Sequence, residues 1–398
     1  MAPARRTRIL IVDDSAVMRS LLRSVVTADA TLEVAGTAAD GASALNSLGL
    51  NRPDLILLDV EMPVMDGLVT LRELHKRGHR MPVIMCSSLT QRGARVTIEA
   101  LAAGASDYVT KPAGQAGREA AMRTLGNELI PKIHALTQAS SMAASGSSSN
   151  LFSNRPPAVF PGAARAQQVP ALGHHGGTPV RPQPITATPT VVVIGVSTGG
   201  PAALDILLPA LPAVFPLPVL IVQHMPELFT RLFAERLNNR CNLRVCEASE
   251  GDAVRAGSIL IARGNWHLEA MTPSAASAAP TLHLSQGSLE NHCRPAVDVL
   301  FRSAAKVYGS GVLAVVLTGM GSDGMLGCRV IREHGGSVLA QDEASSTVWG
   351  MPGAVAAAGL AHKILPLDAI APEILRIVSR ARSEVHPAVR DVSGQGVS

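Results

Sequence analysis

The first 130 residues alternate short apolar runs with segments of helical periodicity. Apolar runs occur in RILIVDD, LEVAGTA, DLILLDV, PVIMCSS and SDYVTKP, whereas SAVMRSLLRSVVTA and DGASALNSLGL carry the spacing of amphipathic helices. Runs that do not alternate with polar residues are typical of strands buried on both faces of a parallel sheet. The sequence therefore predicts a doubly wound, flavodoxin-like α/β domain of five strands over residues 1–134.

The periodic pattern stops after this domain. Residues 135–189 are rich in Ser, Ala, Gly, Pro and Gln, as in SSMAASGSSSN and RPPAVFPGAARAQQVP. A segment of this composition cannot bury enough apolar surface to offset the entropy that ordering would cost. We therefore predict a disordered linker over residues 135–189.

Strand-like runs return at VVVIGVSTGG and recur in PVLIVQH, SILIA, TLHLS and VLAVVLTG. They predict a second α/β domain over residues 190–382, with a mostly parallel sheet. Within it, residues 271–280 separate HLEA from TLHLS and are predicted to form a hairpin loop. Residues 383–398 are expected to be a flexible tail.

Composition narrows the possible partners and the location. The chain of 398 residues carries 35 basic and 31 acidic side chains, with two Trp, two Tyr and six Phe residues. It lacks the basic groove with stacking rings that single-stranded nucleic acid requires, so we expect no nucleic-acid role. The longest uncharged apolar run, residues 206–222, contains four prolines, and the five cysteines have no zinc-ligand spacing. With two acids interrupting the N-terminal apolar run, we expect a cytoplasmic protein without membrane insertion.

Polar residues follow three strands of the first domain. Asp13 and Asp14 come after RILIV, Asp59 ends DLILLD, and Ser87 follows PVIMC. The carboxyl ends of parallel strands line one crevice, so these side chains are expected to converge. Adjacent carboxylates repel one another, and a Mg²⁺ ion with oxygen ligands relieves that repulsion. Lys111 adds a cation suited to a phosphoryl oxygen, so the cluster predicts a phosphoryl acceptor with one Asp as the nucleophile.

Each acid alone also fits a structural role, such as an N-cap for Asp14. The motifs VDDS, LLDVEMPVMDGL, MCSS and TKP, however, together resemble the response-regulator receiver family. That resemblance implies that a partner histidine kinase phosphorylates Asp59. It also implies that Asp14, Asp59 and the Glu61 carbonyl hold Mg²⁺, and that Asp13 acts through a bound water. Ser87 and Lys111 would sense the phosphoryl group, and Tyr108 would be the aromatic residue that switches conformation.

In the second domain, Ser197 lies between a predicted strand and a predicted helix in a GxSxG pattern. The glycines permit a tight turn, and Pro201 suits a first helical turn. Such a turn presents the hydroxyl at the sheet edge, close to backbone N–H groups that stabilise an oxyanion. A phosphate cradle or a purely structural turn would fit the same segment, although GxGxxG and GK[ST] are absent.

His224 and Asp323 also follow predicted strands. Alone, the His is typical of a packed residue, and the Asp before Gly of a turn. Together with Ser197 they share one rim of the sheet, which predicts a triad of nucleophile, base and orienting acid. The chain order Ser, His, Asp differs from the Ser, Asp, His order of α/β-hydrolases, in which His334 or His362 would have to be the base.

The segments GVSTGGP, QHMP, CRPAVDVLF, TGMGSDG and WGMPGAV resemble the chemotaxis-specific protein-glutamate methylesterase family (CheB-like) over residues 190–380, and a receiver ahead of this domain is that family's own arrangement. The resemblance implies demethylation of glutamate methyl esters on chemoreceptors with release of methanol, and deamidation of glutamine, without a cofactor for the esterase. It also implies that Thr198 and Met320 assist the imidazole and the oxyanion.

We expect the unphosphorylated first domain to cover the rim that carries Ser197, and phosphorylation of Asp59 to uncover it. Two alternatives remain open from the sequence. One is a signalling adaptor, in which the receiver is tethered to an inactive binding domain. The other is a nucleotide-binding domain at the glycine-rich turn.

Overall fold

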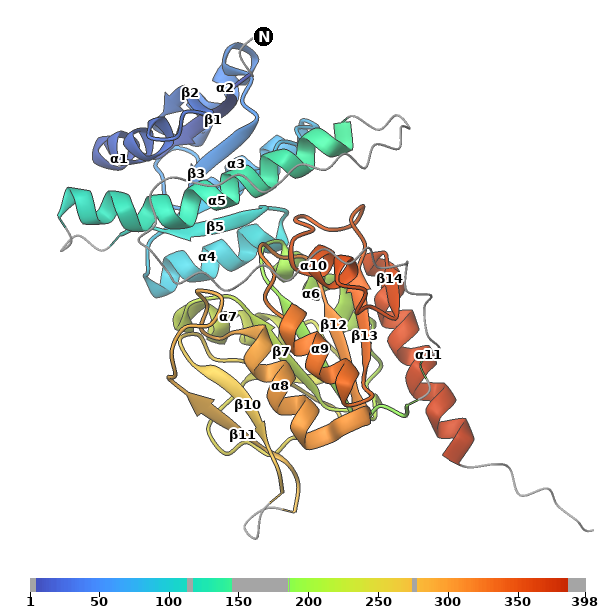
Figure 1. Cartoon of the computed structure of the whole chain (residues 1–398). Coiled ribbons are helices and arrows are strands. Elements are labelled where there is room, and N and C mark those ends of the chain that lie inside the picture. Colours follow the sequence, from blue (N-terminus) through green and yellow to red (C-terminus); the bar gives the residue numbers. More distant parts are fainter. Residues whose placement is uncertain (1–4, 113–116, 145–184, 186, 274–277, 386–398) are drawn as a thin grey trace, which may run out of the picture.

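The computed structural model describes residues 5–112, 117–144, 185, 187–273 and 278–385, and it contains two α/β domains (Figure 1). Most of the predicted linker, the centre of the predicted hairpin loop and the tail from residue 386 lie outside the described residues.

The N-terminal domain is a five-stranded parallel sheet with strand order β2-β1-β3-β4-β5. Its strands are β1 (Thr7–Val12), β2 (Leu32–Ala38), β3 (Leu55–Asp59), β4 (Val83–Ser87) and β5 (Asp107–Thr110). Its helices are α1 (Ala16–Thr27), α2 (Gly41–Asn51), α3 (Gly67–Lys76), α4 (Gln91–Ala102) and α5 (Arg118–Ala144). The predicted doubly wound architecture is confirmed.

The apolar strands of this domain are buried on both faces. In β3, Leu55 and Leu57 pack in the cluster that includes α1 and α5, whereas Ile56 and Leu58 pack with α2, α3 and α4. Because successive side chains of a strand point to opposite faces, a continuous apolar run fills both layers.

Helix α5 is longer than the sequence analysis predicts. It continues through Ala144, so the expected linker boundary at residue 135 falls inside the helix. The segment HALTQASSMAA contains good helix formers, and Leu136 is buried against the domain. The change in composition therefore comes before the end of the helix.

The C-terminal domain contains a seven-stranded sheet with strand order β14-β13-β12-β6-β7-β9-β8, and all of its strand pairs are parallel. The strands are β6 (Val191–Val196), β7 (Val219–Gln223), β8 (Arg244–Glu247), β9 (Ser258–Ile261), β12 (Val312–Val316), β13 (Ser337–Gln341) and β14 (Lys363–Leu365). A separate antiparallel pair, β10 (His267–Met271) and β11 (Thr281–Ser285), matches the predicted hairpin.

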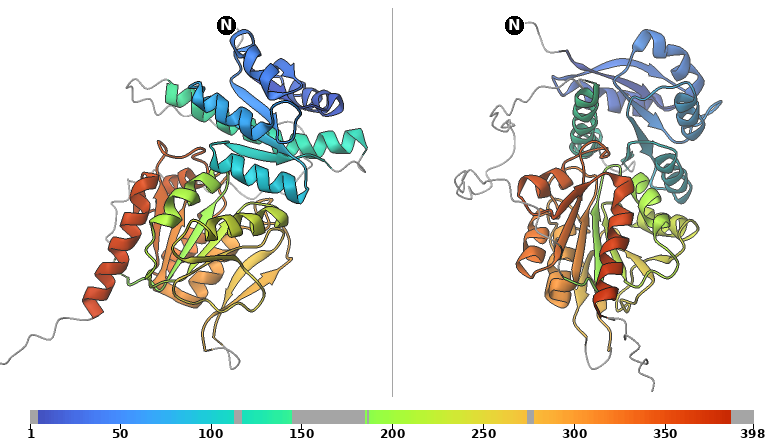
Figure 2. Two further views of the ribbon diagram at one scale, coloured as in Figure 1. Left: turned by 180° about the vertical axis from the view of Figure 1, so that it is seen from behind. Right: turned by 90° about the vertical axis from the view of Figure 1, so that its right-hand side faces the viewer.

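Helices cover both faces of this sheet (Figure 2). One face packs against α6 (Gly200–Leu207), α7 (Glu227–Asn238) and α11 (Leu367–Val385). The other packs against α8 (Val297–Tyr308), α9 (Met325–Glu333) and α10 (Met351–Ala357), together with the hairpin. Two short 3₁₀ segments, η1 (Leu208–Ala210) and η2 (Gly309–Gly311), complete the domain. Helix α11 includes residues 383–385, the first three residues of the predicted tail.

The two domains meet where α4 of the first lies against α6 and α7 of the second, and a side chain of β5 also reaches α7 (Figure 1). The ring of Tyr108 stacks on the ring of Phe229, with centroids 4.7 Å apart and an interplanar angle of 13°. Lys132 of α5 lies over the same tyrosine ring, with Nζ 5.1 Å from its centroid. Tyr108 and Phe229 are both buried, so the apolar core continues from one domain into the other.

Candidate active site

Ser197 follows β6 directly and precedes α6. The turn passes through Gly199, whose φ of 77° lies in the left-handed region that a residue with a Cβ rarely adopts. Ser197 N donates to Thr318 O at 3.0 Å, and Ser197 O accepts from Gly200 N at 2.8 Å and from Gln223 Nε2 at 3.0 Å. The backbone of the predicted nucleophile is therefore held from both sides.

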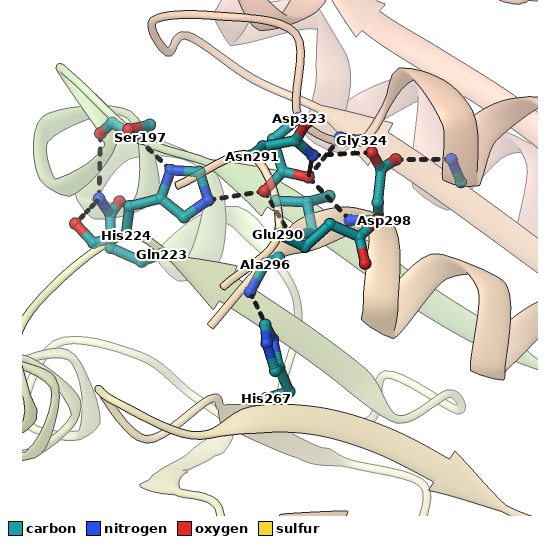
Figure 3. Close-up of polar contacts among 12 residues, drawn as sticks. Ser197, Gln223, His224, His267, Glu290, Asn291, Ala296, Asp298, Asp323 and Gly324 are labelled. Carbon is teal, nitrogen blue, oxygen red and sulfur yellow. Dashed lines mark hydrogen bonds and ion pairs between the residues drawn. The ribbon is translucent and has the colours of Figure 1, made fainter. Parts of the chain in front are cut away.

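His224 follows β7, the strand that pairs with β6. Its Nδ1 lies 3.1 Å from Ser197 Oγ, and its Nε2 lies 2.9 Å from Asp323 Oδ2 (Figure 3). An ionised carboxylate only accepts hydrogen bonds, so Nε2 carries a proton, and in the neutral imidazole Nδ1 accepts from the serine hydroxyl. The structure thus brings Ser197, His224 and Asp323 into one hydrogen-bonded chain.

Asp323 lies in the loop between β12 and α9, and its carboxylate is surrounded by donors. Oδ2 accepts from Val297 N at 2.7 Å as well as from His224, and Oδ1 accepts from Asp298 N at 3.0 Å and Gly324 N at 2.9 Å. Burial alone would raise the pKa of Asp323, but the hydrogen bond and charge of His224 and the backbone donors hold it below its ordinary value. Asp323 is therefore an ionised acceptor for the imidazole.

The environment of His224 favours the imidazolium. Burial alone would lower its pKa, but the hydrogen bond to Asp323, the charge of that carboxylate and the nearby Cys293 raise the pKa to about 9. Cys293 lines the same cavity as Ser197 and His224. In this arrangement the imidazole is protonated at neutral pH, so little of it is in the form that accepts a proton from Ser197.

Of the two residues predicted to assist the triad, Thr198 contacts the N-terminal domain directly, and Met320 packs against a cluster that both domains share. Thr198 Oγ1 donates to Asp107 Oδ2 at 2.6 Å in a buried hydrogen bond. Met320 packs against the apolar cluster to which α5 contributes Leu129 and Ile133. Neither side chain has a described hydrogen bond to the triad.

The alternative bases lie elsewhere. His334 is exposed, and its Nδ1 donates to Val330 O in α9. His362 packs beside Arg332 and accepts from Val338 N at 3.0 Å. Neither residue lines the cavity that contains Ser197.

A cavity of about 1890 Å³ runs between the domains and reaches the triad. Its walls include Pro131 and Asn127 of α5 on one side and Ser197 and His224 on the other. The proposed nucleophile therefore faces the N-terminal domain across this space.

The acidic side chains of the N-terminal domain also converge. Carboxylate oxygens of Asp13, Asp14 and Asp59 all lie within 4.8 Å of one another. Lys111 Nζ lies 2.8 Å from Asp13 Oδ2 and 2.8 Å from Asp59 Oδ2. Burial, and secondarily the charge of Asp13, raise the pKa of Asp59 to about 6 although Lys111 opposes the shift.

This cluster fits a hard divalent cation. Its donors are carboxylate oxygens, and Asp13 Oδ2 is buried without a well-directed hydrogen bond from any described residue. The Glu61 side chain is engaged by Arg92 at 3.3 Å and lies outside the group of three acids. Ser87 is buried, and its hydroxyl donates to Ser88 O at 3.2 Å.

Comparisons with known proteins give a separate family match for each of the two domains. Residues 9–122 match the response regulator receiver domain family, and residues 192–374 match the CheB methylesterase family. A protein-glutamate methylesterase/protein-glutamine glutaminase from Nocardioides is 47% identical over 383 residues, covering 96% of this chain and 98% of the relative. This chain belongs to the CheB methylesterase family.

Further relatives agree with that membership. The corresponding protein of Trichodesmium erythraeum is 45% identical, covering 93% of this chain and 98% of its own. Among solved structures, the catalytic domain of Thermotoga maritima CheB methylesterase is 40% identical and covers 48% of this chain and 100% of its own, with a TM-score of 0.46. The two family matches and the Nocardioides relative make this chain a methylesterase preceded by a receiver domain. Among its described residues, no helix is both long and apolar enough to cross a membrane.

One turn beside the predicted triad carries no motif that marks it in the sequence. Asn291 and His292 both have positive φ, at 51° and 62°, and Glu290 and Cys293 exchange backbone hydrogen bonds across them. Asn291 Nδ2 donates to Asp323 Oδ1 at 2.9 Å (Figure 3). The residues ENHC contain the turn-forming Asn but no recognisable catalytic motif, so only spatial proximity identifies them.

Proposed function

We propose that this CheB protein hydrolyses methyl esters of glutamate side chains on chemoreceptors and deamidates receptor glutamines, with Ser197 as the nucleophile. The observation that carries the proposal is the hydrogen-bonded chain from Ser197 Oγ through His224 to Asp323. Both substrates present a side-chain acyl carbon and pass through a tetrahedral oxyanion, so one triad serves both.

The proposed reaction has two steps. His224 Nδ1 takes the proton of Ser197 Oγ as this oxygen attacks the acyl carbon. The tetrahedral intermediate collapses, and the leaving group takes the proton from Nδ1 and departs as methanol from the ester or ammonia from the amide. Water then attacks the acyl-enzyme with His224 as the base again, releasing the glutamate carboxylate and restoring Ser197.

Asp323 supports both steps by holding Nε2–H. This fixes the tautomer in which Nδ1 faces Ser197, and the negative charge stabilises the imidazolium formed on proton transfer. We assign Thr198 and Met320 to the surroundings of the imidazole and oxyanion. For Thr198, that role requires release from its hydrogen bond to Asp107 of the receiver domain.

For the receiver, we propose that a histidine kinase phosphorylates Asp59. Asp14, Asp59 and the Glu61 carbonyl would hold Mg²⁺, with Asp13 acting through a bound water; the ion would offset the charge on the transferring phosphoryl group. Lys111, 2.8 Å from the Asp59 carboxylate, supplies a cation for the phosphoryl oxygens, and Ser87 supplies a hydroxyl. We place the enzyme, together with the histidine kinase that phosphorylates it, in the cytoplasm.

We further propose that the receiver restrains the unphosphorylated esterase. Support comes from the Asp107–Thr198 hydrogen bond and from the stack of Tyr108 on Phe229, because both join β5 to the elements that surround Ser197. Tyr108 lies three residues before Lys111, so a shift of Lys111 on phosphorylation of Asp59 would act on the segment that contacts Phe229. Phosphorylation would then uncover the Ser197 rim.

Labelling with a fluorophosphonate tests the nucleophile separately from turnover. The expected result is one adduct on Ser197, with a rate that increases when acetyl phosphate and Mg²⁺ are present. Ser197→Ala should not be labelled, and Ser322→Ala, which alters an exposed serine next to Asp323 in the chain, should be labelled like the wild type. Labelling that persists in Ser197→Ala would refute the assignment.

A further inference from the structure

One side-chain amide lies between two buried carboxylates beside the triad (Figure 3). Nδ2 of Asn291 donates to Asp323 Oδ1 at 2.9 Å and to Asp298 Oδ2 at 3.0 Å. The NH₂ group of an amide has two hydrogens, so both of its donors are used. Asn291 therefore links the acid that contacts His224 to a second acid that does not.

The contact with Asp323 bears on how its carboxylate is oriented. Backbone donors from Val297, Asp298 and Gly324 reach the two oxygens from the start of α8 and from the loop that holds Asp323. Within the part of the chain that the structure describes, Asn291 supplies the side-chain donor on Oδ1. The plane of the carboxylate, and hence the direction of Oδ2 toward His224, depends on the donors to both oxygens.

The second carboxylate explains why a donor is needed at this position. The side chain of Asp298 is buried, and its Oδ1 accepts from Gly327 N at 2.6 Å. Burial, and in part the charge of Asp323, raise the pKa of Asp298. Two buried acids side by side repel each other, and a shared NH₂ group reduces that repulsion.

The turn that contains Asn291 is held firmly. Its φ is 51°, a conformation that Asn and Asp tolerate better than most residues. Glu290 N donates to Cys293 O at 3.1 Å and Cys293 N donates to Glu290 O at 2.8 Å. Arg302 of α8 binds both carboxylate oxygens of Glu290, at 2.6 Å each. The amide is thus directed at the two acids by a turn that is itself anchored.

We propose that Asn291 is a positioning residue for the hydrolytic reaction, which fixes the Asp323 carboxylate toward His224 and separates its charge from that of Asp298. This inference rests on the proposed function, because it assigns Asp323 the role of orienting the base. Asn291 acts through Asp323 and His224, without a chemical step of its own.

The variant Asn291→Asp tests this role. Aspartate has the same size and also tolerates positive φ, but it replaces the NH₂ donor with a third negative charge. We expect kcat to fall about 10- to 100-fold, the range for losing a hydrogen bond to a charged group, with KM within about twofold of the wild type. The acidic limb of the kcat–pH profile should move to higher pH, because added negative charge raises the pKa of the imidazole.

Two further variants control for folding and for the turn. Asn265 is another residue with positive φ (65°), and its Oδ1 accepts from Arg294 rather than facing an acid. Asn265→Asp should therefore retain the wild-type kcat and pH profile. Asn291→Gly accommodates the backbone while removing the donor, and it should lower kcat without adding charge. If Asn291→Asp does not fold, as judged by its thermal melting, Asn291→Gly carries the test.

Ser197→Ala, assayed in parallel, separates the two proposals. If Ser197→Ala is inactive and the Asn291 variants keep the wild-type kcat and pH profile, the positioning role is wrong and the triad stands. A rise in KM alone would also overturn the positioning role, because it would place Asn291 in contact with substrate. If Ser197→Ala retains activity, the proposed function itself fails.

Discussion

Thr198, the neighbour of Ser197, donates a 2.6 Å hydrogen bond from Oγ1 to Oδ2 of Asp107 in the receiver domain. Asp107 Oδ1 also lies 3.3 Å from Lys132 Nζ of α5, so the accepting carboxylate is held by its own domain. The next residue along β5, Tyr108, stacks on Phe229 of α7. Through one strand, β5, the receiver therefore contacts both the turn that contains Ser197 and helix α7.

Weakening the polar contact should release the esterase. Asp107→Asn keeps the size of the side chain but removes the charge that strengthens the bond from Thr198. We expect the unphosphorylated variant to hydrolyse ester about fivefold faster than the wild type. This factor corresponds to a loss of about 1 kcal/mol from the free energy that holds the receiver against the esterase domain. Asp40→Asn, which keeps an N-cap on α2, is the control and should show no gain. Unchanged basal activity in Asp107→Asn would show that the Asp107–Thr198 hydrogen bond does not restrain the esterase.

The aromatic contact should act in the same direction. Phe229→Leu removes the stack on Tyr108, an interaction worth about 0.5–1.5 kcal/mol beyond burial. We expect a two- to tenfold rise in basal activity and little change in the activity reached with saturating acetyl phosphate. Phe233→Leu, on the same helix and equally buried, provides the matched control for loss of core volume. Equal activation by both variants would indicate a general loosening of α7.

The pH dependence of the unphosphorylated enzyme follows from the raised pKa of His224. The protonated imidazole is inactive as a base, so kcat/KM should rise with pH through a midpoint near 9. An imidazole with an ordinary pKa would reach its plateau well below pH 8. The measurement is initial rate against pH at low substrate concentration, and a plateau already reached at pH 7.5 would contradict the assignment.

Cys293 offers a separate check on the same group. Its position beside His224 contributes to the raised pKa of the imidazole, after the hydrogen bond to Asp323. Cys293→Ala should therefore move the midpoint of kcat/KM to lower pH while leaving Ser197 and Asp323 in place. Cys246→Ala, which changes a thiol of β8 away from the triad, should leave the midpoint where it is. A midpoint that does not move in Cys293→Ala would show that the thiol is irrelevant to the base.

The proposed phosphorylation of Asp59 can be tested separately from the esterase. Acetyl phosphate with Mg²⁺ should label the wild type and fail to label Asp59→Asn, because an amide oxygen is not a nucleophile of comparable strength. Asp66→Asn, which retains an N-cap on α3, should be labelled like the wild type. Intact-mass measurement distinguishes these results, and equal labelling of wild type and Asp59→Asn would refute the assignment.

The parallel strands could be predicted because their side chains are buried on both faces. β3 and β6 are therefore continuous apolar runs that stand out from their surroundings. The hydrophobic pattern does not reveal β8 or β14, which lie at the two edges of the larger sheet and have exposed positions such as Arg244 and Lys363. Nor does it reveal β13, where only three apolar residues stand together in SVLAQ.

The candidate site, too, could be predicted from the sequence only in part. Ser197, His224 and Asp323 were identifiable because each follows a strand of one parallel sheet, and strand ends meet at a common edge. The Asp107–Thr198 bond and the contacts of Asn291 depend on how a domain and a turn pack against that edge. No periodicity or motif encodes such packing, so these relationships required the structure.

Release of methanol from membranes that carry methylated receptors tests the central claim most directly. Wild-type enzyme and Ser197→Ala are compared with and without acetyl phosphate and Mg²⁺. The account predicts that wild type releases methanol faster when phosphorylated, and that Ser197→Ala loses at least about a thousandfold of the rate in both conditions. Methanol release by Ser197→Ala at a rate near that of the wild type would contradict it.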